Sequence, residues 1–576
     1  MLRLELTRLL QLRLWILERF RPGETEVTLF WAALVGVAGG LAAPAFRLAI
    51  GGVQFALTGS TLTLAETAAT LAPWQRILVP AAGGLLAGLV LFLGVRFAGG
   101  KRSADYMEAV TLGDGVIRTR PTLIRIVSSV FSIGSGGSIG REGPQVQLAA
   151  LLASSIGRFA KLPRPRLRLL VACGAAAGIA SAYNAPIGGA LFVAEIVLGT
   201  IAMQTFGPLI LSSVMATVVA RIFLGGEPLF EVPRFRLVTY WELAPHLALG
   251  LVAGSFAPWF LRLLDQSGEL FSRWRAPVFA RMAVGGLVVG LLSVHEPEVW
   301  GNGDSAVSAI LSSSLVWTGL LTLLAYKLLA TAATVGSGAV GGVFTPTLLV
   351  GGIMGGLVGI PIHHLFPEST AQPNAYALVG MGAMLSATTL APLTAILILF
   401  EMTLDYDIVL PLMVACVTAY TSARAFGGKS IYAEALPSTP PPGPAPLDAL
   451  TVGDLMRTDP PRIAENARFQ AIVETFVKHR HHNLYVVDRE GRFRGVIPLH
   501  EIKPFLNDPE LAKLAIAQDV LREEFPFVTP DSTLRETLRQ FEGHSGERLP
   551  VLDEGRMLVG SISKSDLLLT LSGSRA

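Results

Sequence analysis

Long runs of apolar residues dominate the chain up to about residue 436. A helix that crosses a bilayer needs about 20 predominantly apolar residues. Runs that fill all or much of that length lie at 30–50, 77–97, 209–224, 247–264, 283–294 and 315–335. The pattern predicts an α-helical integral membrane protein with many spans, several of them short or tilted.

The pattern changes at a proline-rich segment, PSTPPPGPAP, which begins at residue 437. Such a segment forms a semi-rigid, extended spacer and cannot continue a helix. We therefore divide the chain into a membrane domain (27–436), a linker (437–449) and a soluble tail.

The tail alternates between strand and helix patterns. The segment NLYVVDREGRFRGVIPLHEI predicts two short strands around a turn, followed by a helix. Residues 483–502 align without a gap onto residues 548–567, so that Asp488 matches Asp553 and Gly495 matches Gly560. The tail is thus predicted to be α/β, with one β-β-α unit at 450–507 and another at 508–576.

The membrane domain also contains a repeat. GSGGSIGREGP (134–144) aligns without a gap onto GSGAVGGVFTP (336–346), so that Gly140 matches Gly342. A second block follows at a slightly larger offset, in which Glu195 matches Glu401. Transporters built from two such halves usually bind their substrate between them, where glycine-interrupted helices begin inside the bilayer.

Each repeat places a glycine loop directly before a helix. Irregular backbone at membrane depth is tolerated only where protein or a water-filled path satisfies its amides. A helix N-terminus offers unpaired amides and a partial positive charge, so two converging N-termini favour an anion without a full countercharge. Such a site can also release the ion, as conduction requires.

Composition narrows the function classes. Only 15% of the residues are charged, and the net charge of +3 gives no electrostatic support for a nucleic-acid partner. Residues 1–26 place five arginines among leucines, which predicts a cytoplasmic amphipathic helix rather than a cleaved signal peptide. The two cysteines, Cys173 and Cys416, lie in apolar segments and predict neither a disulfide framework nor a metal site.

Three motifs in order resemble those of the CLC chloride channels and chloride/proton exchangers: GREGP at 140–144, GVFTP at 342–346 and GGKSIY at 427–432. The tail resembles a tandem CBS pair. The resemblance implies a CLC fold, which is an inverted repeat with re-entrant half-helices, plus a cytoplasmic CBS pair. It also implies a homodimer in the inner membrane, with an ion path in each subunit.

The resemblance implies roles for individual residues. Glu142 would be the gating carboxylate that occupies the outer anion position and leaves when protonated, although it could simply cap its own helix. Phe344 could alternatively be a core aromatic residue, and Tyr432 an anchor at the membrane interface. The anion-binding positions implied are Gly140, Arg141, Gly143, Val343, Phe344 and Tyr432.

The sequence departs from the family at the inner side of the anion site. Members usually carry a GSGxP segment there, whereas this chain reads Gly100-Lys101-Arg102-Ser103-Ala104. Lys101 replaces the serine, and Ser103 supplies the nearest hydroxyl. Lys101 and Ser103 are therefore expected near the anion, although basic residues at a helix end also act as topology signals.

A second departure concerns protons. Exchangers commonly carry a glutamate at the position of Ile196, and isoleucine cannot titrate. The expectation is therefore passive or weakly proton-coupled chloride conduction, with a coupled chloride/proton antiporter as the alternative because water or Glu195 could replace the relay. Glu195 and its repeat mate Glu401 are expected to be structural partners of helix ends.

In the tail, Ser563 and Asp566 match the hydroxyl and the ribose-binding carboxylate of CBS modules that bind adenine nucleotides. An ordinary helix N-cap is the alternative. The first unit has Pro498 and Glu501 instead, so at most one ordinary nucleotide site is expected. No cofactor is required for transport.

Chloride is the expected substrate, because fluoride specialists of the family replace the proline that Pro144 retains here. A divalent-cation carrier would need clustered carboxylates, and the apolar spans offer only scattered ones. A membrane-embedded hydrolase using Ser135 or Ser337 is a distant alternative, because the neighbouring spans provide no evident base. We therefore expect a voltage-gated anion transport protein without enzymatic activity.

Overall fold

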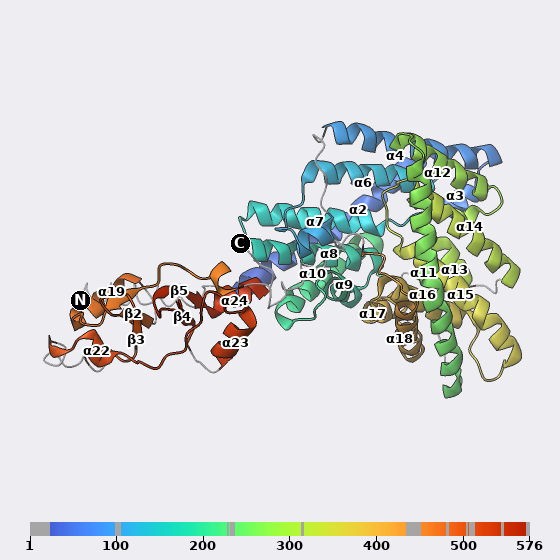
Figure 1. The fold of residues 1–576 in the computed structure, drawn as a ribbon. Helices are drawn as coiled ribbons and strands as arrows, with labels where there is room; N and C mark the ends of the chain where they lie inside the picture. The colour runs from blue at the N-terminus through green and yellow to red at the C-terminus, as the bar shows by residue number, and fades with distance from the viewer. Residues whose placement is uncertain are drawn as a thin grey trace, which may run out of the picture. The chain divides into compact units, whose positions relative to one another are not determined.

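The computed structural model describes residues 24–97, 105–226, 230, 237–312, 316–433, 451–479, 483–502, 505, 513–542 and 546–571 (Figure 1). The chain separates into two compact units, residues 1–437 and 438–576. Several predictions lie outside the described residues: nearly all of the helix at 1–26, the linker at 437–449, and the positions Lys101 and Ser103.

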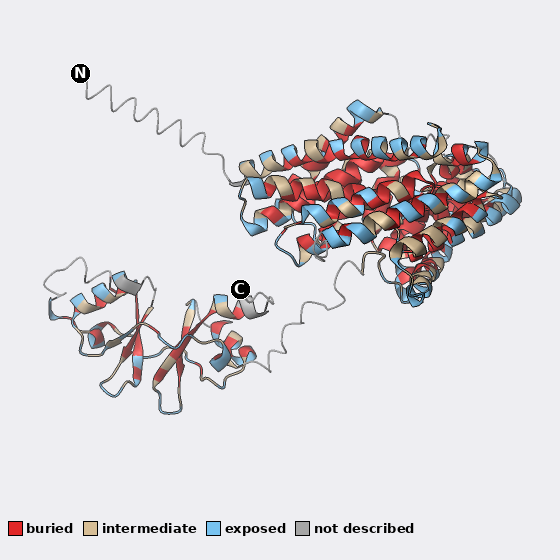
Figure 2. Cartoon of the chain, turned by 90° about the horizontal axis from the view of Figure 1, so that it is seen from above, coloured by how far each residue is buried: buried red, intermediate tan, exposed pale blue. Residues whose placement is uncertain are grey.

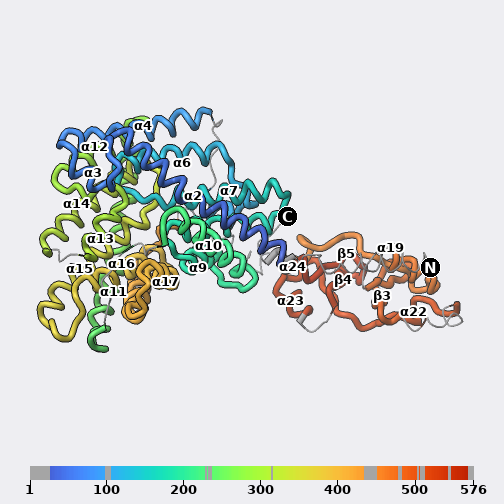
Figure 3. Tube along the Cα trace, turned by 180° about the vertical axis from the view of Figure 1, so that it is seen from behind, coloured from blue at the N-terminus to red at the C-terminus, as the bar shows by residue number. Residues whose placement is uncertain are grey.

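The named secondary-structure elements in the described part of the membrane unit are all helices, and Figure 3 traces its path from behind. Six of the described helices are long and apolar enough to cross a membrane. The first half contains α2 (Glu24–Thr58), α3 (Leu64–Thr70), α4 (Pro73–Phe97), α5 (Tyr106–Thr111), α6 (Thr119–Gly134), α7 (Glu142–Phe159), α8 (Arg164–Tyr183), α9 (Pro186–Phe192), the π-helical turn η1 (Val193–Val197) and α10 (Met203–Leu224). The second half contains η2 (Tyr240–Glu242), α11 (Leu243–Arg273), α12 (Val278–Ser293), η3 (Pro297–Val299), α13 (Asp304–Ser312), α14 (Trp317–Gly336), α15 (Phe344–Leu365), α16 (Pro373–Thr389), α17 (Pro392–Thr403) and α18 (Val409–Ala425).

The outer faces of this unit are apolar. Figure 2 shows buried residues along the middle of the helix bundle and exposed residues on its outer helix faces. Large apolar side chains such as Leu48, Ile222 and Met203 are more than two-thirds exposed. A soluble protein rarely exposes so much apolar surface, whereas lipid chains solvate it well.

The helices inside the bundle approach each other at glycines. Gly351 on α15 faces Gly380 on α16, and a Cβ atom on either residue would collide with the carbonyl oxygen of the other. Membrane helices pack in this way because close backbone contact provides much of the dispersion attraction that holds them together.

The two sequence repeats of the membrane unit have matching backbone conformations at equivalent positions. Gly136 and Gly338 occupy equivalent positions in the repeats and have φ angles of 97° and 99°. Asn184 and Leu390 are also equivalent, and both adopt the left-handed conformation with φ of 57° and end α8 and α16. The internal repeat of the sequence is therefore also a structural repeat.

The C-terminal unit contains two small sheets. In the first, β2 lies between β1 and β3, parallel to β1 and antiparallel to β3. In the second, β4 and β5 pair in the same antiparallel register, and both sheets have a bulge at the equivalent position of the repeat. The elements are η4 (Val452–Asp454), β1 (Arg462–Ala464), α19 (Phe469–His479), β2 (Asn483–Val487), β3 (Phe493–Pro498), α22 (Ala517–Val520), α23 (Leu534–Glu542), β4 (Arg548–Leu552), β5 (Leu558–Ser563) and α24 (Lys564–Leu571).

The two sequence units of the tail exchange their leading segments. Ala517 and Val520, which open the second sequence unit, pack in the core around Ile472 of the first. Val452, which opens the first sequence unit, packs in the core around Leu549 of the second. A boundary at 507/508 therefore separates the sequence repeats but not the two hydrophobic cores.

Candidate functional site

The two glycine loops meet at equivalent residues. The amide of Gly140 donates to the carbonyl oxygen of Gly342 at 2.6 Å, and the amide of Gly342 donates back to Gly140 at 2.8 Å. Because the two glycines match in the repeat, an approximate two-fold axis relating the two halves passes between them. Helices α7 and α15 each begin shortly after this bridge, so their N-termini are neighbours.

Glu142, the first residue of α7, reaches across to the first turn of α15. Its side chain is buried, and Oε1 accepts hydrogen bonds from the amide of Thr345, at 3.0 Å, and from the Thr345 hydroxyl. The hydroxyl of Tyr183 lies 3.2 Å from the same Thr345 hydroxyl. The carboxylate therefore occupies the partly positive N-terminus of α15, which is a place that stabilises anions.

The second carboxylate oxygen faces the bridge. Oε2 of Glu142 is buried without a hydrogen-bond partner among the described residues, and a Cβ atom on Gly140 would collide with it. The Gly140 amide is committed to Gly342. Gly140, expected among the anion ligands, thus leaves room for the Glu142 carboxylate, and its amide is bonded to the other loop. Its role as an anion ligand stays a prediction.

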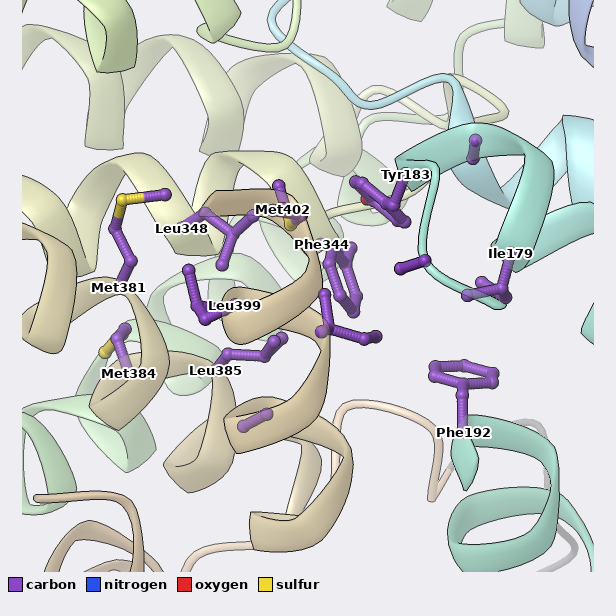
Figure 4. Close-up of a cluster of buried hydrophobic side chains, with 14 of the residues drawn as sticks. Ile179, Tyr183, Phe192, Phe344, Leu348, Met381, Met384, Leu385, Leu399 and Met402 are labelled. Carbon is purple, nitrogen blue, oxygen red and sulfur yellow. The ribbon is translucent and has the colours of Figure 1, made fainter. Parts of the chain in front are cut away.

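Aromatic rings surround the start of α15. The Phe344 ring lies 4.8 Å from the Tyr183 ring and 6.5 Å from the Phe192 ring, and Tyr432 meets Phe192 edge-on at 5.5 Å. Figure 4 shows Tyr183 and Phe344 close together, with Phe192 in the same region. The structure therefore brings together Phe344 and Tyr432, which lie far apart in the sequence.

A cavity of about 740 Å³ opens beside these residues. Its lining includes Glu142, Gly143, Val343, Phe344 and Tyr432, which the sequence placed at the anion site. It also includes polar and charged side chains on α5, α6 and α7 or directly before α5, namely Asp105, Glu108, Arg125 and Gln147. The cavity is large enough for an ion with water, and Glu142 lies on its wall.

Arg141 does not direct its guanidinium at this cavity. Its Nη2 lies 3.1 Å from Oδ2 of Asp304, the first residue of α13. The side chains are 21% and 30% exposed, so water screens the pair only in part. This ion pair links the residue before Glu142 to the start of α13.

Sequence reasoning missed three residues of the site: Tyr183, Thr345 and Asp304. Thr345 carried a signal, because it is a hydroxyl residue inside the GVFTP motif at the repeat position of Gly143. Tyr183 and Asp304 belong to no motif. Their contacts with Thr345 and Arg141 join distant parts of the sequence and depend on the tertiary fold.

Glu195 and Glu401 lie at helix ends. Glu401 accepts hydrogen bonds from the amides of Ile187 and Gly188, at 3.0 and 2.7 Å, at the start of α9. Glu195 accepts bonds from the amide and the hydroxyl of Thr394, at 2.8 and 2.6 Å, at the start of α17. The structure thus places both carboxylates on backbone amides of the other repeat, in the position of helix-end partners.

Ile196 lies beside Glu195 on the π-helical turn η1 and packs partly buried against the main core. Among the described residues, the lining of the cavity includes Phe192 of the preceding helix but neither Glu195 nor Ile196. The position at which exchangers commonly carry a glutamate is therefore apolar and lies away from the cavity wall.

In the second CBS sequence unit, Ser563 and Asp566 bond to each other at the start of α24. The Ser563 hydroxyl donates to Asp566 at 2.6 Å, and the Asp566 amide donates back at 3.0 Å, which is N-cap geometry. Arg457 lies 3.5 Å from the Asp566 carboxylate. Glu501, the equivalent of Asp566 in the first sequence unit, accepts shorter hydrogen bonds from Arg522 of the second sequence unit, at 3.0 and 2.6 Å.

A repeated membrane unit whose glycine loops join two helix N-termini, beside a buried carboxylate and a cavity, defines a membrane protein for anion transport. The chain belongs to the voltage gated chloride channel family, the CLC proteins, whose family model matches residues 83–424. The CBS domain model matches residues 452–508 and 517–573. Members of this family are transporters or channels, so the chain is not an enzyme.

Relatives support the same assignment. A ClcB-like chloride channel protein of Ralstonia nicotianae is 51% identical over 409 residues, which is 70% of this chain and 95% of that protein. A slow cyanobacterial Cl⁻/H⁺ antiporter, solved by X-ray crystallography, is 29% identical with a TM-score of 0.64, covering 71% of this chain and 96% of that one. A eukaryotic CLC transporter shares the fold at 20% identity, with a TM-score of 0.60 and coverage of 94% and 97%.

Proposed function

We propose that the protein conducts chloride across the membrane between its two glycine loops, with Glu142 as the gate. The observation that carries this proposal is the contact between Glu142 Oε1 and the amide of Thr345 at the start of α15. A carboxylate and a chloride ion are both monovalent anions and compete for the same helix N-terminus. Protonation neutralises the carboxylate, weakens the contact and lets the side chain leave.

The proposed ion ligands are neutral groups near this N-terminus. Val343, Phe344 and Gly143, whose amides are the proposed ligands, line the cavity, as does Tyr432, whose hydroxyl is proposed to join them from the last described segment of the unit. Lys101 and Ser103 stay proposals for the inner mouth. Neutral ligands hold chloride weakly enough for it to leave again.

Conduction is proposed to be passive or weakly coupled to protons. An uncompensated charge in apolar protein costs several kcal/mol or more. A proton that moves between the inner solution and Glu142 therefore needs a titratable relay or water. Ile196 supplies neither, and it lies away from the cavity lining.

A coupled chloride/proton antiporter is the second candidate. Asp105 and Glu108 are carboxylates on the wall of the same cavity as Glu142, and either could pass protons to water inside it. The similarity to a Cl⁻/H⁺ antiporter also favours this candidate.

Purified protein in sealed liposomes tests the proposal. Chloride efflux that depends on the protein, together with a reversal potential measured under a pH gradient, reports both the ion and the coupling. Passive conduction predicts a reversal potential that follows the chloride gradient alone. No protein-dependent chloride movement would contradict the function itself.

Two further proposals concern assembly and regulation. The protein is proposed to act as a homodimer with one path per subunit, as is usual in related structures. An adenine nucleotide is proposed as an optional ligand at Ser563 and Asp566, because CBS domains commonly bind such nucleotides.

A further inference from the structure

One face of helix α14, in the second repeat, is turned towards the glycine loop of the first repeat. Lys327, Thr331 and Thr334 follow one another at helical spacing, so they lie on the same side of the helix. All three are buried, and Lys327 is completely so. A lysine buried at membrane depth is expensive and requires partners.

The partners of Lys327 lie in the segment between α12 and α13. Its Nζ donates to the carbonyl oxygens of Val299 and Gly301, at 3.1 and 2.9 Å. The Gly301 amide in turn donates to the carbonyl oxygen of Gly136 at 3.3 Å. Trp300, between the two carbonyls, packs so closely on Gly136 that a Cβ atom there would collide with its ring. Lys327 thus bonds to a segment that contacts the first glycine loop at Gly136, both through a hydrogen bond and through packing.

Thr331 and Thr334 form hydrogen bonds with the same loop directly. The Ser138 amide donates to the Thr334 hydroxyl at 3.2 Å, and the hydroxyls of Ser138 and Thr331 are 3.1 Å apart. Ser138 lies in the loop just before the gate residue Glu142. The second repeat has a valine, Val340, at the position that corresponds to Ser138, so this hydroxyl anchor belongs to the loop that carries the gate.

The segment that Lys327 holds also reaches Glu142 through an ion pair. Asp304 follows Gly301 by three residues and pairs with Arg141, the residue before Glu142. The anchor therefore reaches the start of α7 through the loop backbone and through this ion pair.

We infer that Lys327 is a positioning residue for the gate. From the second repeat, it fixes the loop of Gly136 and Ser138 so that Glu142 meets the amide of Thr345. This inference rests on the proposed gating role of Glu142. It assigns to Lys327 a mechanical role through its two hydrogen bonds, as distinct from a role of its charge in attracting anions.

Three substitutions separate the two roles. Lys327→Met removes the donors and the charge, Lys327→Gln keeps amide donors without the charge, and Lys327→Arg keeps the charge with a different donor geometry. Thr322→Val on the same helix is the matched control, because its hydroxyl bonds within α14, to Thr318. Chloride efflux from liposomes is measured at external pH values of about 7.5 and about 4.5, around the range in which carboxylates titrate.

When the loop is held loosely, Glu142 binds the amide of Thr345 less well. Lys327→Met should therefore raise chloride efflux at the higher pH. The ratio of acid to neutral efflux should fall by about tenfold, as expected for the loss of buried hydrogen bonds. Lys327→Gln should recover a large part of the ratio, and Thr322→Val should leave it unchanged. If Lys327→Gln matches Lys327→Met while Lys327→Arg matches the parent, charge is responsible and the anchoring role is wrong.

A further variant controls for misfolding of Lys327→Met. A Thr331→Val, Thr334→Val double variant loosens the loop without changing a charge, so it tests the anchor if Lys327→Met does not fold. An unchanged ratio of acid to neutral efflux in this variant would overturn the inference.

A second experiment separates failure of the anchor from failure of the gate. Combined with Glu142→Gln, Lys327→Met should have no further effect on the ratio of acid to neutral efflux. If Glu142→Gln alone keeps the pH response, the gate proposal fails and the inference falls with it. If Glu142→Gln loses the pH response but the Lys327 and threonine variants keep the ratio of the parent, the gating role of Glu142 is retained and only the anchoring role of Lys327 is rejected.

Discussion

Glu195 and Glu401 cap each other's helices across the interface of the two repeats. Glu195 follows α9 and accepts backbone hydrogen bonds at the start of α17, whereas Glu401 lies near the end of α17 and accepts them at the start of α9. The end of each segment is therefore tied to the start of the other helix. A carboxylate at a helix N-terminus satisfies free amides and the positive end of the helix dipole. This exchange fixes the two repeats relative to one another.

Replacing either glutamate by glutamine should therefore destabilise the membrane unit. Charge-assisted hydrogen bonds contribute more than neutral ones, so each substitution should cost about 1–3 kcal/mol of unfolding free energy. Thermal unfolding of the detergent-solubilised protein measures the loss. Glu269→Gln is the control, because its pair with Arg273 is exposed and long at 3.7 Å. Equal unfolding temperatures for all three variants would show that the caps contribute nothing.

Thr345→Val should weaken the closed gate without removing the amide that Glu142 uses. The lost hydroxyl contact is worth roughly 1 kcal/mol, which predicts a chloride efflux at neutral pH about three to ten times that of the parent. Thr347→Val is the matched control, because its hydroxyl donates to the carbonyl oxygen of Val343, directly before α15, and not to Glu142. An efflux that matches the parent, or one that falls, would mean that Thr345 does not hold the gate shut.

Ile196→Glu should increase proton coupling by adding a titratable group at the position of the missing relay. The expected result is a higher ratio of protons to chloride in reversal-potential measurements, while Ile196→Leu keeps the parent ratio. Chloride flux itself should persist in both variants. If the parent already moves protons uphill at a fixed ratio, the weak-coupling proposal is wrong and the cavity carboxylates Asp105 and Glu108 become the candidates for the relay.

Asp566→Ala should weaken adenine nucleotide binding by about tenfold, since a carboxylate that accepts hydrogen bonds from a ribose contributes on the order of 1.4 kcal/mol. Calorimetric titration of the full-length protein with ATP and with AMP measures the affinity. Glu501→Ala is the control, because Arg522 already occupies that carboxylate. Anion selectivity should not change in either variant. Unaltered nucleotide affinity after Asp566→Ala would end the proposal of a site there.

The repeats made much of the fold predictable. Equivalent positions of the sequence repeat have matching φ angles, as at Gly136 and Gly338 and at Asn184 and Leu390. Glycine and asparagine favour the left-handed region, whereas a leucine there costs roughly 1–2 kcal/mol, so no local rule predicts the conformation of Leu390. Only its place in the repeat indicates it.

The site was predictable in part. The motifs grouped Glu142, Val343, Phe344 and Tyr432 at one anion site, and the structure places these residues on the wall of one cavity. Their roles in binding and gating stay predictions. Tyr183 could not be predicted, because its contact with Thr345 depends on how α8 packs against the start of α15.

The hydrogen bond from the Gly140 amide to Gly342 could likewise not be predicted from the sequence. An alignment of the two loops shows that they are equivalent but not that they bond to each other. In the tail, the exchange of leading segments between the CBS units depends on which hydrophobic core each segment joins. A boundary drawn from sequence repeats cannot show this.

The most direct test of the central claim is the pH dependence of chloride efflux in the Glu142→Gln variant. Glutamine keeps the shape of the side chain but carries no charge at any pH, so it should not compete with chloride for the N-terminus of α15. The account predicts that parent efflux from liposomes rises as external pH falls from about 7.5 to about 4.5, where carboxylates become protonated. It predicts for Glu142→Gln an efflux that stays open across that range. A variant that stops conducting, or one that keeps the full pH response of the parent, would contradict the gating role of Glu142.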